Sequence, residues 1–408
     1  MIKIPDSKRV VVTGLGVVSS IGIGWQDFWK NLLAGKSGIS KIESFDTSKY
    51  DRHYGGEVRN FDPCQFIDRR KVNQMGRASQ MAIAAAKLAI KDAGLTVKSL
   101  PKERTGVCLG TTMGEPQILE EAIINSMPQG RLKADSISAL TYPSNSITLN
   151  VSHELKICKD SLLFGNACSA GNYATGYSYD LIRKGEARMM LAGGVDAFSM
   201  IAFTGFHRLL AMAPEKCQPF DKNRKGMMLG EGAGMLILES LESAQKRKAN
   251  IYAEILGYGL SCDANSMTAS ASEQILKATR KALKNSAISP DQVDYISAHG
   301  TGTKENDSAE CRAIFDVFGQ RSKKIPISSI KSMLGHTLGA AAAIEAVVCC
   351  LSIKKGKIPP TTNFTTKDEE CDIDCVANKA KNHKVKTALN NSQAFGGNNA
   401  CLILRQAN

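Results

Sequence analysis

Residues 164–177 read FGNACSAGNYATGY, and this stretch places one cysteine, Cys168, at the head of a run of small residues. The run predicts a tightly packed helix that begins at Cys168 and ends in LIRKGEA (181–187). A lone cysteine is more often a small buried residue than a nucleophile. The rest of the chain therefore has to show whether Cys168 has a chemical role.

A second helix of the same kind indicates a duplicated chain. It begins near His336 and ends in SIKKGKI (352–358), a segment similar to LIRKGEA. In the same order, AIKDAGL (89–95) and ALKNSAI (282–288) each close a helix and precede a strand. Similar segments in the same order predict an ancient duplication with two halves, 1–250 and 251–408.

Short apolar strands alternate with helices along the chain, which is typical of α/β layers. The helix expected over 78–94 places Met81, Ala84, Ala85 and Leu88 on one face. The strands are expected at RVVVTGLGVVSS (9–20), GVCLGTT (106–112), MMLAGGVDAFS (189–199) and GAGMLILES (232–240).

The composition is that of an ordinary globular protein. Of 408 residues, 43% are hydrophobic and 22% are charged. No apolar run is long enough to span a membrane, and the N-terminus lacks a signal-peptide pattern, so we expect a cytoplasmic protein. The twelve cysteines are scattered without zinc-ligand spacing, so we expect free thiols and no metal site.

The chain is basic, with a formal net charge of +13. Its Lys and Arg residues are dispersed and only 6% of its residues are aromatic, whereas nucleic-acid binding favours basic clusters with interleaved aromatics. We therefore expect an acidic protein partner and no nucleic acid.

Two of the six histidines lie in unusual surroundings. His299 ends a predicted strand in SAHGTGT, and His336 lies in a glycine-flanked loop before an alanine-rich helix. Ligands of α/β proteins bind beyond the carboxyl ends of strands, where such turns fall. A helix beginning at Cys168 would favour its thiolate. One cysteine with two histidines indicates acyl-thioester chemistry.

Five motifs now carry a resemblance that covers the chain in order: NACSAGNYATG (166–176), FDKNRKGMMLGEGAGML (220–236), SAHGTGTKENDSAE (297–310), KSMLGHTLGAAAAIEA (331–346) and NNSQAFGGNNACLIL (390–404). They resemble the elongating β-ketoacyl-[acyl carrier protein] synthases, which are condensing enzymes of thiolase fold. The resemblance implies a duplicated, five-layered αβαβα architecture, with the nucleophile in the first half and both catalytic histidines in the second.

The resemblance also implies roles for individual residues. Cys168 would carry the acyl group, and His299 and His336 would hydrogen-bond the thioester oxygen while malonyl-carrier loses carbon dioxide. The backbone N–H groups of Cys168 and Phe395 would form the oxyanion hole, and Phe395 would also gate the site. The remaining roles fall to an electrostatic pair, Lys331 with Glu345, and to three threonines that would bind the pantetheine arm, Thr268, Thr301 and Thr303.

The partners implied are an acyl carrier protein and a second subunit, in a homodimer or in a heterodimer with a chain-length-factor-like protein. No cofactor is expected on this chain, because the carrier brings the phosphopantetheine. A basic patch would receive the acidic carrier, and the stretch FIDRRKVNQMGRAS offers Arg69, Arg70, Lys71 and Arg77.

Four positions depart from the fatty-acid members: Gln393 replaces an aromatic residue, Ala394 a glycine, Asn398 a threonine and Ser266 a histidine. Ala394 matters most, because a gate loop there needs the freedom of glycine if φ is positive. These departures favour a ketosynthase of type II polyketide biosynthesis over a housekeeping 3-oxoacyl-[acyl carrier protein] synthase II of fatty acid elongation. A Cys–His thioester hydrolase and a non-catalytic dimer subunit are the remaining alternatives.

Overall fold

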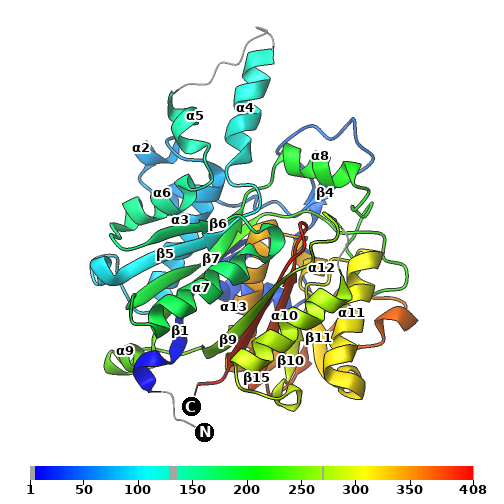
Figure 1. Ribbon diagram of the computed structural model, residues 1–408. Helices are drawn as coiled ribbons and strands as arrows, with labels where there is room; N and C mark the ends of the chain where they lie inside the picture. The colour runs from blue at the N-terminus through cyan, green and yellow to red at the C-terminus, as the bar shows by residue number, and fades with distance from the viewer. Residues whose placement is uncertain (1–4, 128–135, 269–270, 408) are drawn as a thin grey trace.

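The computed structural model describes residues 5–127, 136–268 and 271–407, and its strands form one long mixed sheet in two similar halves (Figure 1). In the first half the strands follow the order β1 (Val10–Ser19), β8 (Gly232–Ser240), β7 (Met189–Asp196), β5 (Thr105–Gly110) and β6 (Ser161–Phe164). In the second half they follow the order β9 (Ala253–Cys262), β16 (Asn398–Arg405), β15 (Thr387–Gln393), β10 (Tyr295–Ser297), β11 (Pro326–Ser328) and β13 (Asp374–Cys375).

The two halves repeat the same pairing pattern. From β1 outward the successive pairs are antiparallel, antiparallel, parallel and parallel, and the pairs from β9 outward follow the same succession. A short antiparallel contact joins the halves, where Val10–Val12 pair with 253–255. A repeated order and polarity is what a duplicated chain produces.

Helices make the other three layers. Two central helices contact each other and strands of both halves: α7 (Ala170–Arg183) and α13 (Ala341–Lys355). The outer face of the first half is covered by α3 (Arg77–Asp92) and α6 (Ser146–Leu155), and that of the second by α10 (Ser272–Asn285) and α11 (Lys304–Phe318). The arrangement is the αβαβα sandwich that the resemblance implied.

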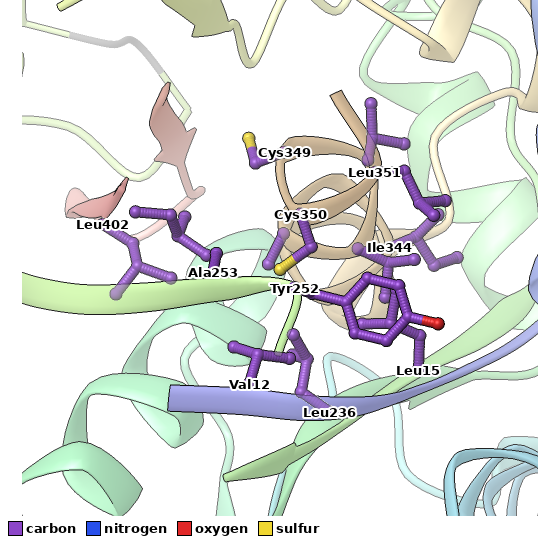
Figure 2. Close-up of a cluster of buried hydrophobic side chains, with 14 of the residues drawn as sticks. Val12, Leu15, Leu236, Tyr252, Ala253, Ile344, Cys349, Cys350, Leu351 and Leu402 are labelled. Carbon is purple, nitrogen blue, oxygen red and sulfur yellow. The ribbon is translucent and has the colours of Figure 1, made fainter. Parts of the chain in front are cut away.

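The middle of the core surrounds α13, which is apolar on all sides. Its residues from Ala341 to Ile353 are all buried, as expected of a helix between two sheets. Figure 2 shows Ile344, Cys350 and Leu351 of α13 among side chains of both halves, including Val12 of β1 and Leu402 of β16. Cys349 and Cys350 are therefore packing residues, and all twelve cysteines are free.

The four strands and the helix expected from the sequence are present as β1, β5, β7, β8 and α3. Smaller elements complete the fold: β2 (Gly22–Ile23), α1 (Trp25–Leu33), β3 (Ser40–Lys41), β4 (Tyr54–Gly55), α2 (Arg69–Val72), α4 (Pro116–Ser126), α5 (Ser136–Thr141), α8 (Met200–Arg208), α9 (Leu241–Lys246), α12 (Lys331–Leu334), β12 (Lys357–Ile358) and β14 (Lys381–Asn382). Within the described ranges, every helix is too short or too polar to cross a membrane.

Candidate active site

Cys168 lies where the edge strand β6 turns into the central helix α7. A short 3₁₀ turn, Ala167–Ser169, carries it, and Ala167 takes a left-handed φ of 48°. That conformation costs a non-glycine residue about 1–2 kcal/mol and persists only where the surrounding packing demands it. The expectation that α7 begins at Cys168 is wrong, because the α-helix begins at Ala170. The cysteine therefore sits in a constrained turn just before the helix.

The two candidate histidines lie side by side. His299 follows β10 and His336 follows α12, and their ring centroids are 5.2 Å apart at an interplanar angle of 81°. The backbone N–H of Leu338 donates to Nδ1 of His336 at 3.1 Å, so the proton of this ring is on Nε2. Burial, with the nearby Lys331 charge, lowers the pKa of both histidines well below the usual value. Both rings are therefore neutral, and Nε2 of His336 is a hydrogen-bond donor.

Two buried carboxylates hold the turns that carry these histidines. Glu310 of α11 accepts the backbone N–H groups of His299 (2.9 Å) and Gly300 (2.8 Å). Asp196, at the end of β7, accepts the N–H of Gly339 at 2.6 Å and three donors of the 111–113 segment. Sequence reasoning missed both carboxylates. The signal available for Glu310 was an acidic residue beside the small and apolar residues Ala309, Cys311 and Ala313 of the same helix.

Lys331 and Glu345 form the ion pair that the sequence indicated. The Lys331 ammonium donates to Oε1 of Glu345, and both side chains are buried. Burial raises the pKa of Glu345 to about 7, although the Lys331 charge lowers it. The Lys331 ammonium is the cation that also acts on Cys168 and on both histidines.

The surroundings of Cys168 favour its thiol over its thiolate. Burial raises its pKa to about 12, while the Lys331 charge and the backbone N–H groups of Phe395 and Cys168 lower it. This direction is opposite to the thiolate that the sequence led us to expect, because Cys168 is only 5% exposed. The same two N–H groups are those expected to form the oxyanion hole.

One cavity of about 450 Å³ joins the reactive groups to the surface. Its wall includes Cys168, both histidines and Phe395, together with the three threonines predicted to bind the pantetheine arm, Thr268, Thr301 and Thr303. The hydroxyls of Thr301 and Thr303 are 2.9 Å apart. Phe395, the residue expected to gate the site, packs on Phe206 of α8, with ring centroids 5.5 Å apart.

The departures from the fatty-acid pattern can now be located. Ala394 is not left-handed; Gly396 and Gly397, each with φ of 81°, supply the positive φ of this loop, so the expected strain at Ala394 is absent. Gln393 lines the cavity, is 3% exposed, and its Oε1 has no hydrogen-bond partner in the described part of the chain. Asn398 accepts from the Tyr173 hydroxyl at 3.3 Å, and Ser266 accepts the Thr268 N–H at 3.2 Å.

The four basic residues expected to receive a carrier do not line the cavity, and most of them are paired with acidic residues. Arg77 binds the buried Glu231 through two nitrogen atoms, which makes it a structural residue. Lys71 pairs with Glu154 and Arg70 pairs with Asp68, whereas Arg69 is exposed. None of the four lines the cavity. In Figure 1, α2 lies to the left, and α8 and α11, whose residues line the cavity, lie to the right.

Comparison with known proteins identifies the family. Residues 7–244 match the family model "Beta-ketoacyl synthase, N-terminal domain", and residues 252–365 match "Beta-ketoacyl synthase, C-terminal domain". A 3-oxoacyl-[acyl-carrier-protein] synthase 2 of Staphylococcus aureus is 39% identical, over 98% of this chain and 99% of the relative. The corresponding Synechocystis protein is 38% identical over 98% of this chain and 99% of its own.

Solved structures of ketosynthases are similar to this chain as well. The ishigamide ketosynthase/chain length factor superposes with a TM-score of 0.95, at 42% identity, covering 98% of this chain and all of the other. A type II polyketide ketosynthase, solved in complex with its acyl-carrier protein and bound to the hexaketide, has a TM-score of 0.91 at 34% identity, with the same coverage. The chain belongs to the β-ketoacyl synthase family and is a condensing enzyme with acyltransferase chemistry.

Proposed function

We propose that the chain condenses an acyl group on Cys168 with malonyl-[acyl carrier protein] in type II polyketide assembly. The observation that supports this chemistry is one cavity containing a cysteine, two neutral histidines and a pair of N–H groups directed at the sulfur. Neutral imidazoles and backbone amides are donors that stabilise a developing oxyanion without bringing a full charge.

The first step is acyl transfer to Cys168. Its Sγ forms a bond to the acyl carbon, the bond from that carbon to the pantetheine sulfur breaks, and the thiol proton goes to the departing sulfur. The N–H groups of Phe395 and Cys168 stabilise the oxyanion that forms in between. Because Cys168 starts as a thiol, this proton transfer accompanies the attack, and no thiolate has to accumulate beforehand.

The second step is decarboxylative condensation. Malonyl-carrier loses carbon dioxide, and its thioester oxygen takes up enolate charge beside His336, whose Nε2 carries the proton. The enolate carbon attacks the Cys168 thioester, the bond from that carbonyl carbon to Sγ breaks, and the sulfur leaves as a thiolate that takes a proton from solvent water. His299, held by Glu310 at its backbone, is the second donor to the enolate oxygen.

The polyketide assignment is supported by Gln393. Fatty-acid members carry an aromatic residue there, and this chain places a buried amide in the cavity wall. The 42% identity to the ishigamide ketosynthase/chain length factor is in line with it. Elongation of fatty acids is the second candidate, favoured by the 39% identity to the S. aureus synthase over nearly the whole chain.

We also propose an acyl carrier protein and a second, related subunit as partners, with no cofactor bound by this chain itself. Strand β6 ends the sheet order and is partly exposed, and an unpaired edge is a place where another chain adds. Helices α4 and α5 stand out from the body in Figure 1. Exposed apolar side chains lie on and beside them, with Ile124, Met127 and Leu140 at 52%, 74% and 77%. Such a surface is typical of an interface.

The test is reconstitution with malonyl-carrier and an acyl-carrier primer, with and without any related subunit that co-purifies from the native host. A polyketide enzyme extends the primer several times without reduction, and mass spectrometry of the carrier detects the poly-β-ketone. A product that stops after one extension, with or without a second subunit, supports fatty acid elongation instead. Cys168→Ala is the control and should abolish both products.

The two histidines should fail differently from the cysteine. We expect His299→Ala and His336→Ala to accept an acyl group on Cys168 but to lose decarboxylation by about 10²–10³-fold, because each donor acts mainly when enolate charge develops. Intact-protein mass spectrometry measures the acylation, and release of labelled carbon dioxide measures the decarboxylation. Loss of acylation with normal decarboxylation in both variants contradicts these roles.

A further inference from the structure

Two lysines at the mouth of the cavity have no role in the chemistry above. Lys225 and Lys304 both line the cavity and are exposed. Neither ammonium forms an ion pair or a hydrogen bond with the described residues of the chain. Two cations that the protein itself leaves uncompensated at the entrance of a reaction cavity indicate an anionic ligand.

The two segments that carry these lysines are joined to each other. The N–H of Gly226 donates to the carbonyl of Gly302 at 2.9 Å. Arg224 donates to the carbonyls of Thr303 at 3.4 Å and Lys304 at 3.3 Å. These hydrogen bonds join segment 224–226 to segment 302–304. They hold the backbones of Lys225 and Lys304 at the same part of the cavity rim.

The charges nearby leave the rim positive. Arg224 is buried and paired with Asp368 and Asp307, so its charge is compensated within the protein. Among the described residues, Glu305 is the one acidic residue in the cavity wall. Lys304 begins α11, and the side chain of Thr303 does not cap this helix, because its hydroxyl bonds Thr301 instead. The open N-terminus of this helix adds partial positive charge at the same place.

We propose that Lys225 and Lys304 form a phosphate subsite at the cavity mouth, which holds the phosphodiester of the carrier's phosphopantetheine arm. The proposal rests on the proposed function and adds to it a contact for the arm outside the Thr301–Thr303 wall. A phosphate at the rim places the pantetheine chain along the threonines and its thioester toward Cys168. Ammonium groups bind phosphate as point charges.

Minimal donors separate this contact from recognition of the carrier protein. We compare acyl-4′-phosphopantetheine with acyl-pantetheine as donors to Cys168, in the wild type and in Lys225→Gln/Lys304→Gln. Two exposed charge contacts to one phosphate are worth about tenfold in affinity. We expect kcat/KM to favour the phosphorylated donor about tenfold in the wild type and to favour it hardly at all in the double variant. Lys216→Gln/Lys222→Gln removes the same charge from exposed lysines that do not line the cavity, and it should keep the wild-type preference.

Calorimetry with 4′-phosphopantetheine alone measures the contact without catalysis. We expect the Kd to rise about tenfold in Lys225→Gln/Lys304→Gln and to stay unchanged in the control variant. An equal Kd in all three proteins, or an equal preference for the phosphorylated donor, overturns the subsite. A higher kcat/KM for acyl-coenzyme A than for acyl-carrier overturns the assignment to the carrier. If neither donor acylates Cys168 but the Kd still rises, the proposed function fails and the phosphate subsite stands.

Discussion

The thiol of Cys168 should react slowly with alkylating agents at neutral pH. Burial raises its pKa to about 12, and only the thiolate is alkylated. We expect the rate of iodoacetamide labelling to rise about tenfold per pH unit between about pH 7 and 10. Peptide mass spectrometry follows it beside the exposed Cys64, Cys158 and Cys262, which should label first. A rate that is fast and independent of pH above 7 contradicts the protonated thiol.

The buried amide of Gln393 should lower the stability of the protein. Its Oε1 is buried without a partner among the described residues, and such a group costs about 1–3 kcal/mol. Gln393→Met keeps the volume and removes the polar atoms, so we expect the free energy of unfolding to rise by about 1 kcal/mol. The midpoint of urea unfolding measures it. A loss of stability as large as that of an ordinary core substitution shows that the amide is hydrogen-bonded in solution.

The sequence predicted which single residues meet in the cavity where a short motif marks their positions. Cys168, His299 and His336 stand at strand ends or helix starts, within motifs of a few residues. Glu310 and Asp196 were not predictable as supports, because each acts on a turn that only the tertiary fold brings to it. The pKa of Cys168 was misjudged for the same reason, since burial is a property of the folded chain.

At the scale of elements, the acidic side chain that caps α3 should make stability depend on pH. Glu115 accepts the N–H groups of Ala78 and Ser79 at the start of this helix. Burial raises its pKa to about 7, although these N–H groups lower it. The folded state therefore holds this proton to a higher pH than the unfolded chain does. The stability that it contributes is present below about pH 4.5 and is lost as the pH rises to about 7.

Glu115→Gln removes this titration. We expect the free energy of unfolding of the wild type to fall relative to the variant by up to about 3 kcal/mol between pH 4.5 and 8. Urea unfolding at four pH values measures the difference. The broken hydrogen bond adds an offset that does not change with pH, so only the slope is diagnostic. Parallel curves for the two proteins contradict the raised pKa.

Among the elements, the repeated segments proved the most informative part of the sequence. AIKDAGL and ALKNSAI close α3 and α10, which cover opposite outer faces, and LIRKGEA and SIKKGKI close the central helices α7 and α13. The predicted start of α7 was wrong by one short turn, because α-helices often begin with a 3₁₀ turn, which a sequence pattern does not separate from the helix. The strand predicted before His299 is present as β10, whereas β11 and β13 are only three and two residues long, too short for an apolar pattern to show.

For the whole molecule, the excess of positive charge is the property that bears on partners. The sequence has 52 Lys and Arg against 39 Asp and Glu, and a carrier protein is acidic. Long-range attraction between opposite charges raises the association rate and weakens with salt. The cavity mouth with Lys225 and Lys304 faces the arm, whereas Arg69 and Arg70 lie on α2, on another part of the surface. Binding of the arm at the cavity mouth and docking of the carrier on α2 can therefore be tested separately.

Arg69→Glu/Arg70→Glu tests whether α2 takes part in docking. If it does, the variant should lose about tenfold or more in kcat/KM with acyl-carrier, because like charges now oppose the acidic partner. It should still accept an acyl group from a short pantetheine thioester, which makes no contact with α2. Salt should slow the wild type more steeply than the variant, because screening removes what the substitutions already removed. Lys379→Glu/Lys384→Glu changes the net charge equally at exposed positions of the C-terminal half. If this control loses as much as the α2 variant, the effect belongs to net charge and the docking surface lies elsewhere.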